Sequence, residues 1–306
     1  MSVNAIFREL AVENATKQTE MVDNLLEEAP FLAMMPMQPS TDGFSNVYEE
    51  LSSVTGAGLV DIDDELPMID SSSELKQTDL SILGGTMFVG EDKAMRFGGA
   101  GAYFNGKMPV IMNKTGEDLE KALIYNNFRA FAIDNNKVID ALGVGSTNYS
   151  MLAVTWKSGV ISGLYDPTSY GNGKIFDVKP LNGGELYEKE VDGKIINGYG
   201  VRIKSTLGVQ LASDRYISGI VNIDIANSKT PTEAQLDEML LNCRANGATK
   251  IYMHPALLTW MYNFKGDRMQ MVTSESNVDR TVAMWNGIPI VTTYSFLKAA
   301  ESKVTV

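Results

Sequence analysis

Residues 115–143 read TGEDLEKALIYNNFRAFAIDNNKVIDALG, and this stretch sets the framework of the fold. Apolar side chains recur every three to four positions between Leu119 and Leu142, which is the spacing of one face of a helix. Thr115 can cap the start, Asp118 three residues later makes an imperfect capping box, and Gly143 supplies a stop. The pattern predicts a helix over about 115–142, roughly 40 Å long, whereas helices average about 11–12 residues.

After this helix the sequence changes to β-type patterns. Apolar and alternating runs predict strands at 151–156, 198–204, 221–225, 250–254, 269–272 and 288–292. Two helices interrupt them, one over 230–246 with Pro231 in its first turn and one over 255–264. Because the order contains no regular βαβ repeat, the predicted fold class is α+β.

Before the long helix the sequence predicts a projecting hairpin and an arm. The hairpin is expected over 75–104, where two β-type runs flank Gly84-Gly85 and the surrounding side chains are polar. Residues 5–28 have the pattern of an amphipathic helix that Pro30 ends. The apolar segment 31–37 follows, and a segment of this kind is expected to be buried against another surface.

The negative charge of the chain lies almost entirely in its first quarter. The formal net charge is −12, and residues 1–75 hold 15 of the 38 acids but only two of the 26 bases, Arg8 and Lys17. Such a segment does not bind nucleic-acid phosphates electrostatically. Two interpretations stay open, namely a solvated acidic face or an arm that lies on the surface of a partner.

Residue types that carry catalysis or metal binding are scarce. The single Cys243 and the single His254 exclude an internal disulfide, a cysteine-based zinc site and any site with two imidazoles. His254 precedes Pro255 in an apolar run and is interpreted as a packed residue rather than a member of a triad. The acidic run 61–65 lacks the Gly and the distal Glu of a calcium loop.

Known nucleotide and hydrolase motifs are also missing. The sequence has no P-loop, no complete dinucleotide fingerprint and no Gly-x-Ser-x-Gly elbow. We therefore expect no catalytic, cofactor-binding or metal-binding residue and no enzymatic activity. An acidic hydrolase that uses two carboxylates is an alternative, but no carboxylate pair is singled out. No apolar run reaches the roughly 18–20 residues that span a bilayer and no secretory signal follows Met1, so we expect a cytoplasmic product without a membrane partner.

Several short motifs follow the acidic arm in a recognisable order. They are ILGG at 82–85, VDGKIINGY at 191–199, Gly208-Val209, DRYISGIVNID at 214–224 and WNGIPI at 285–290. Together with the long helix, they resemble the tailed-bacteriophage major capsid proteins of the HK97-type fold over essentially the whole chain. The sequence departs from that pattern at 133–136, where it reads IDNN and relatives often carry Asn-Gly-Asp.

The resemblance implies a division of the chain into named parts. These are an N-terminal arm (1–65), an extended β-hairpin or E-loop (66–112), a peripheral domain (113–220) with the long spine helix at about 115–142, an axial domain (221–290) and a return strand to the peripheral domain (291–306). The implied function is that of a major capsid protein. Its pentamers and hexamers would form an icosahedral head that encloses the genome. The alternative is a nanocompartment (encapsulin-like) shell protein of the same fold.

The resemblance also implies partners and contacts. A separate scaffolding protein and a portal would guide procapsid assembly in the host cytoplasm, and the virion capsid would hold double-stranded DNA without sequence-specific binding. The arm and the hairpin are expected to contact neighbouring subunits through apolar side chains, namely Phe31, Leu32, Met34, Met35, Leu80, Ile82, Met87 and Val89. On this expectation, an Asp at position 31 or 32 blocks shell formation but leaves the subunit folded.

Overall fold

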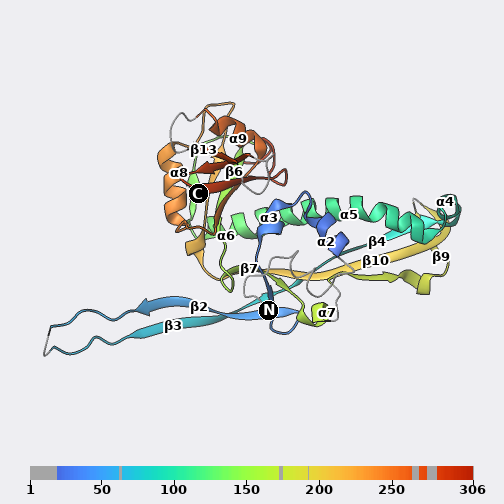
Figure 1. The fold of residues 1–306 in the computed structure, drawn as a ribbon, viewed down its shortest axis with the longest axis horizontal. Coiled ribbons are helices and arrows are strands. Elements are labelled where there is room, and N and C mark those ends of the chain that lie inside the picture. The colour runs from blue at the N-terminus through green and yellow to red at the C-terminus, as the bar shows by residue number, and fades with distance from the viewer. Residues whose placement is uncertain are drawn as a thin grey trace.

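The computed structural model contains three sheets and one long helix, and the smallest sheet, with two strands, projects away from the body (Figure 1). The structure describes residues 19–61, 64–171, 175–191, 193–263, 269–273 and 281–305. Strands and helices both contribute to each core, so the α+β class predicted from the sequence is confirmed. Within the described ranges, no helix is long and apolar enough to cross a bilayer.

The long helix is continuous over 35 residues, from 100 to 134. It consists of α5 (Ala100–Ala122), the π-helical segment η2 (Leu123–Arg129) and α6 (Ala130–Asp134). The predicted bounds of 115–142 are therefore wrong at both ends. Thr115 does not cap the helix, because its hydroxyl donates to the carbonyl of Ile111 at 2.7 Å, one turn earlier in the helix interior.

Packing explains why the helix starts before Thr115. Gly106 and Pro109 disfavour a helix interior, and Pro109 also lacks an amide hydrogen to donate. Phe104 and Met112 are nevertheless buried on the inner side of this segment, Phe104 against Val89 and Met112 in the main core. Burial of these two side chains outweighs the local propensity, because a large apolar side chain contributes about 1.5–3 kcal/mol when buried.

The six-stranded sheet lies alongside the helix and is built on one long strand, β10 (Lys194–Leu211). β4 (Ser81–Gly90) pairs with one edge of β10. From its N-terminal to its C-terminal end, β10 also pairs with three shorter strands, β9 (Tyr187–Val191), β8 (Asp177–Pro180) and β7 (Ile161–Tyr165). β1 (Met37–Pro39) pairs in parallel with β7. At the far end, α4 (Glu91–Arg96) packs Ala94 against Val89 and Phe104.

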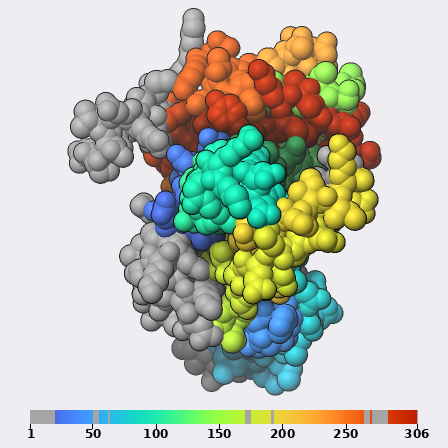
Figure 2. Space-filling model, turned by 90° about the vertical axis from the view of Figure 1, so that its right-hand side faces the viewer, coloured from blue at the N-terminus to red at the C-terminus, as the bar shows by residue number. Residues whose placement is uncertain are grey.

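The seven-stranded sheet forms the second unit, on the side of the helix opposite the hairpin (Figure 2). In spatial order its strands are β13 (Met269–Thr273), β14 (Thr281–Trp285), β15 (Ile288–Thr292), β12 (Thr249–Met253), β6 (Tyr149–Thr155), β11 (Ile217–Ile223) and β5 (Val138–Asp140). Alternate residues of β6 face two different cores. Leu152 and Val154 join the core around the long helix, whereas Met151 and Ala153 join the core of α8 (Glu233–Asn242) and α9 (Pro255–Met261).

Most elements of this unit agree with the sequence patterns. The predicted strands at 151–156, 250–254, 269–272 and 288–292 are confirmed within a few residues, and the run 221–225 is represented by β11. The strand predicted at 198–204 exists, but as β10 it is much longer, from Lys194 to Leu211. α8 begins with a capping box between Thr232 and Gln235. β14 was not predicted. The remaining short elements are α7 (Pro167–Gly171), η3 (Leu181–Gly184) and η4 (Asp214–Tyr216).

The projecting hairpin exists, but it is formed by other residues than predicted. It consists of β2 (Ser45–Thr55) and β3 (Asp70–Asp79), and it extends away from the body of the molecule (Figure 1). Gly84-Gly85 is not a turn but the middle of β4. A Cβ on Gly84 would lie 2.4 Å from the carbonyl oxygen of Ile203, so glycine here allows β4 to approach β10 closely.

The arm packs against the long helix through two short helices. α2 (Thr19–Leu26) and α3 (Pro30–Met34) bury Val22, Leu25 and Phe31 in the core, and Pro30 starts α3 instead of only ending its predecessor. Residues 5–18 of the predicted arm helix lie outside the described residues. α2 approaches the long helix at Gly116, where a Cβ would lie 1.9 Å from the carbonyl oxygen of Leu25.

This close approach predicts that substituting alanine for two glycines of the long helix changes the free energy of unfolding in opposite directions. Gly116→Ala should push α2 away and lower the free energy of unfolding by about 1–3 kcal/mol, because overpacking displaces backbone. Gly106→Ala is the matched control, since nothing lies within 4 Å of its Cβ position, and it should raise the free energy of unfolding by up to about 1 kcal/mol. Urea unfolding of both variants measures the effects, and equal stability of the two would contradict the packing of α2 on the helix.

Candidate functional site

The arm, the long helix and the C-terminal segment meet at one buried carboxylate, that of Glu120. Its Oε2 accepts hydrogen bonds from the backbone amides of Phe31 at 2.9 Å and Leu32 at 3.4 Å. Its Oε1 is hydrogen-bonded to the hydroxyl of Thr293, just after β15. These contacts join three segments that are about 90 and 170 residues apart in the sequence, so Glu120 holds the arm and the C-terminal segment on the helix.

Glu120 belongs to a buried stripe with a four-residue spacing. The stripe consists of Met112, Gly116, Glu120, Ile124, Phe128 and Ala132. An α-helix has 3.6 residues per turn, so positions four apart drift slowly around it. The π-helical segment η2 has a wider turn and keeps Ile124 and Phe128 directed into the core. Glu120 is the polar member of an otherwise apolar or small-residue face.

Burial changes the acidity of this carboxyl group. Desolvation raises the pKa of Glu120 to about 7, although hydrogen bonds from Thr293 and the two arm amides act in the opposite direction. Among the ion pairs of the described residues, none involves Glu120. Its ionised form therefore relies on hydrogen bonds alone.

Phe31 of the arm fills an aromatic cluster beside Glu120. Its ring makes edge-to-face contacts with Phe128 at 4.8 Å, Tyr252 at 4.6 Å and Trp156 at 5.2 Å between ring centroids. Tyr252 also accepts a hydrogen bond from the Trp156 indole and donates to the sulfur of Met34. The start of α3 is thus held by a carboxylate on one side and by three aromatic rings on the other.

A second carboxylate, Glu301, fastens the C-terminal segment further along the helix. Arg129 donates to its Oε2 at 2.8 Å, Ser150 donates to the same oxygen, and Tyr125 donates to Oε1. The guanidinium of Arg129 also lies over the Tyr125 ring, 4.5 Å from the centroid. Unlike Glu120, Glu301 has a cationic partner, because the positive charge of Arg129 lies next to its carboxylate.

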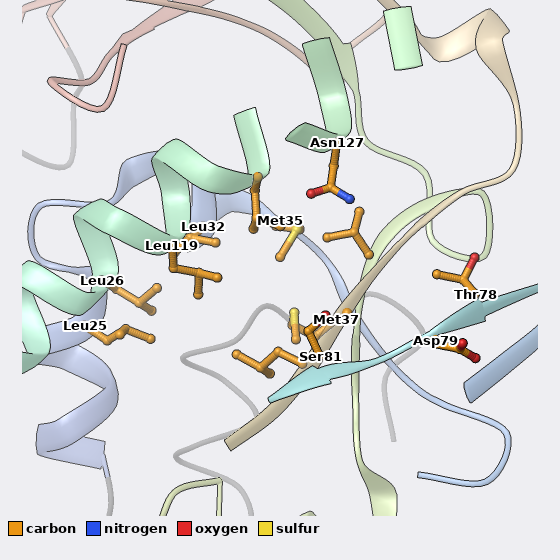
Figure 3. A pocket seen from close by; sticks show the side chains of 14 residues that line it. Leu25, Leu26, Leu32, Met35, Met37, Thr78, Asp79, Ser81, Leu119 and Asn127 are labelled. Atoms are coloured by element: carbon orange, nitrogen blue, oxygen red, sulfur yellow. The ribbon is translucent and has the colours of Figure 1, made fainter. Parts of the chain in front are cut away.

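The packing between arm and helix is incomplete on one side. An opening of about 130 Å³ lies between the arm, the long helix and the base of the hairpin (Figure 3). Its walls are apolar side chains of α2, α3, β1 and the helix, including Leu25, Leu32, Met37 and Leu119. Thr78, Asp79, Ser81 and Asn127 supply the polar part of the lining.

The structure separates the eight expected contact residues into two groups. Phe31, Leu32, Met35 and Val89 are buried within their own subunit. In contrast, Ile82 is 65% and Met34 38% exposed, and Leu80 and Met87 are half-buried. The four buried side chains offer no surface to a neighbour, which differs from the sequence-based expectation. The reason is that the apolar segment 31–37 finds its cover in the subunit's own helix and aromatic cluster.

The hairpin and its base carry a large group of exposed apolar side chains. Eight large apolar side chains there are exposed: Phe44, Val47, Leu59, Val60, Leu66, Met68, Ile69 and Leu75. β3 is exposed along nearly its whole length. Two-stranded hairpins are marginally stable in water, so this one needs further contacts to be well ordered.

The single histidine and the single cysteine are both buried and packed in the interior. His254 is buried, and its Nδ1 accepts a hydrogen bond from the amide of Ala256 at the start of α9. Desolvation lowers its pKa. Cys243 is buried at the end of α8, and burial raises its pKa to about 11. The described residues contain no group of three or more metal-ligating side chains.

Sequence reasoning missed Glu120, Thr293 and Glu301. A signal for Glu120 was present, because it stands four residues before Ile124 and eight before Phe128 on the apolar stripe. A single carboxylate on an otherwise apolar helix face indicates a buried side chain that forms hydrogen bonds to other segments. No comparable signal exists for Thr293 or Glu301, since their partners come from distant segments.

Comparison with known proteins finds one matching family model and several similar solved structures. The family model described as "Major capsid protein GP7" matches residues 122–305. No curated protein sequence matches the chain. A structure of bacteriophage Epsilon15 is 18% identical, with 88% of each chain covered and a TM-score of 0.54. The bacteriophage JBD30 capsid is 13% identical, with 85% of this chain and 88% of the other covered and a TM-score of 0.51.

These two structural matches confirm the predicted HK97-type capsid fold. The holo-SrpI encapsulin complex from Synechococcus elongatus PCC 7942 is also similar, at 10% identity and a TM-score of 0.42, over 67% of this chain and 90% of the other. That similarity is too low to favour a nanocompartment.

The burial of Phe31 predicts a loss of subunit stability. Phe31→Ala should lower the free energy of unfolding by about 3–5 kcal/mol, because it removes a fully buried ring from the aromatic cluster. Phe44→Ala deletes an exposed ring and should change it by less than about 1 kcal/mol. Denaturant unfolding of dispersed subunits checks both values. A Phe31→Ala subunit of native stability would restore the earlier expectation that this ring contacts a neighbour.

Proposed function

Because this chain belongs to the major capsid protein GP7 family and is a major capsid protein forming the icosahedral head of a tailed phage, we propose that its subunits join chiefly through the projecting hairpin. The protein is a structural component of the virion and not an enzyme. The observation that carries the proposal is the hairpin itself, which extends from the body (Figure 1) and on which the eight large apolar side chains named above are exposed.

One face of the hairpin ribbon is suited to lie on a neighbouring subunit. In the β2–β3 register, Val47 is opposite Gln77 and Glu49 is opposite Leu75. Because side chains alternate along a strand, Val47 and Leu75 lie on the same face. The other face carries Asn46, Tyr48 and their partners Thr78 and Lys76 and is more polar. The apolar face and the exposed hairpin tip together form the proposed contact surface.

The exposed members of the original contact set extend this surface toward the body. Ile82 follows the hairpin directly on β4, and Met34 stands at the end of α3. We keep Ile82, Met34, Leu80 and Met87 as proposed inter-subunit contacts. Phe31, Leu32, Met35 and Val89 are not kept, because they are buried in the subunit.

The two main sheets support a proposed assignment of domains. The six-stranded sheet with the long helix would be the peripheral domain, and the seven-stranded sheet with α8 and α9 would be the axial domain around the centres of pentamers and hexamers. The sequence-based bounds of 221–290 omit β5, β6 and most of β11, which belong to the same sheet. The proposed E-loop is likewise 45–79 rather than 66–112, since β2 and β3 form the hairpin.

Further partners follow from the proposed role. Closed shells around DNA require a portal and a scaffolding protein, both implied by the family resemblance. The packaged double-stranded DNA would not be bound sequence-specifically, and the net charge of −12 disfavours tight phosphate contacts. The family match favours this assignment over a nanocompartment shell.

A charge on the apolar face of the hairpin should prevent assembly. Leu75 is 80% exposed, so Leu75→Asp should leave the stability of the subunit within about 0.5 kcal/mol of the native value. It should abolish closed shells, because it removes apolar area from the contact and places a second carboxylate directly opposite Glu49. Leu75→Met keeps the apolar area and is the matched control.

Sedimentation velocity and negative-stain electron microscopy, with scaffolding protein present, read out assembly. Shells of normal yield and size from Leu75→Asp would disprove the hairpin contact. Loss of shells in both variants would show that shape, not apolar burial, determines the contact at this position.

A further inference from the structure

We infer that Glu120 is a proton-operated latch, which fastens the arm to the long helix when it is protonated and loosens the arm when it is ionised. The inference concerns the isolated subunit and does not depend on the proposed hairpin contacts. It starts from the placement of an unpaired carboxylate at the point where a terminal arm, a central helix and the C-terminal segment meet.

Burial away from any cation disfavours the charged form of this carboxyl group, whereas the hydrogen bonds donated by two amides and a hydroxyl favour it. When Glu120 is protonated, its hydroxyl donates to the Thr293 oxygen, and its other oxygen accepts from the amides of Phe31 and Leu32. When the proton leaves, Thr293 reverses and donates to the carboxylate. The hydrogen-bond partners are the same, but a full negative charge then lies in the core without a cation.

Few ionisable groups surround this carboxyl. α3 and β15 carry none. α2 carries Glu20 and Asp23 and is followed by Glu27 and Glu28, and Glu28 is hydrogen-bonded to Glu117 of the long helix. β12 places Tyr252 nearby, with Lys250 two residues earlier on the same strand, and neither forms an ion pair with Glu120. The 293–297 segment contributes Tyr294, which is exposed. On the long helix, Glu117 pairs with Lys114, Lys121 is exposed, and the Tyr125–Arg129–Glu301 cluster is internally compensated.

The arm is the segment that can respond. Its attachment at this point consists of the two amide bonds to Glu120, the ring of Phe31 and apolar packing around Leu25 and Leu32. The opening of about 130 Å³ lies beneath Leu25 and Leu32 (Figure 3), so part of that packing is unfilled. The C-terminal segment, in contrast, has the additional Glu301 cluster and backbone bonds between Asn148 and Glu301.

The direction of the pH effect follows from the raised pKa. An attached arm binds the proton more tightly than a detached one, so attachment is strongest below about pH 4.5 and weakens as the pH rises to about 7. Above that pH the attachment is constant at its weakest value. Between pH 5 and pH 8 the ratio of detached to attached arm should increase roughly 50- to 100-fold.

Hydrogen exchange of the full-length chain tests the latch. Exchange of the Phe31 and Leu32 amides is followed from pH 5 to pH 9, corrected for the intrinsic pH dependence of exchange, with the β6 peptide 149–155 as internal reference. Sedimentation velocity establishes that the oligomeric state is the same at every pH. In the native protein, corrected exchange of the arm amides should rise up to about pH 7 and then level off, while β6 stays constant.

Two variants and one control make the test specific. Glu120→Gln imitates the protonated group and should give slow, pH-independent exchange of the arm amides. Thr293→Val removes the hydroxyl that stabilises the carboxylate and should move the midpoint to higher pH. Asp118→Asn neutralises an exposed acid on the same helix and should keep the native profile.

A flat native profile, or the same pH dependence in Glu120→Gln, would overturn the inference. If Glu120→Gln does not fold, the Thr293→Val profile decides, and an unchanged or lowered midpoint would likewise overturn it.

Discussion

The arm stays on the long helix because a carboxylate without a cationic partner accepts the amide hydrogens that begin α3. This contact is directional, so it determines where α3 starts and places the ring of Phe31 between Phe128, Trp156 and Tyr252. The same carboxylate binds Thr293 and so aligns the segment after β15 with the helix. Other directional contacts hold these segments elsewhere, through the β1–β7 pairing of the arm and the Glu301 cluster of the C-terminal segment, but Glu120 is the contact that joins both to one point of the helix.

The long helix lies at the centre of the molecule because residues four apart form one buried stripe. Met112, Ile124 and Phe128 of this stripe contribute to the core around the helix, which also includes Leu152, Val154 and Val221 of the seven-stranded sheet. The opposite face of that sheet has its own core with α8 and α9. The hairpin belongs to neither core. The subunit therefore buries the apolar side chains of α2 and α3 internally and leaves those of the hairpin exposed, which suits a protein that assembles into a shell.

Sequence patterns predicted the elements better than their bounds. β6, β12, β15 and α8 were recognised because each combines an apolar pattern with a turn or cap signal nearby. Gly84-Gly85 was misread as a turn, since a glycine needed for close backbone approach looks the same in sequence as a glycine needed for a turn. The start of the long helix was placed at Thr115 because Thr115 and Asp118 resemble a capping box. The helix in fact starts earlier, since the burial of Phe104 and Met112 outweighs the unfavourable Gly106 and Pro109.

The sequence by itself determined the α+β class, the long central helix, the absence of familiar catalytic motifs and, through the order of its motifs, the capsid family. These properties depend on periodicity and on short local signals, which can be read directly from the amino-acid sequence. Only the tertiary structure decided which apolar segments face inward and which remain exposed. The segment 31–37 and the hairpin were both expected to contact neighbouring subunits, yet Phe31 is buried within its own subunit and Leu75 is exposed. Burial depends on which surfaces distant residues such as Glu120, Tyr252 and Thr293 bring within reach, and that proximity is created only when the chain folds.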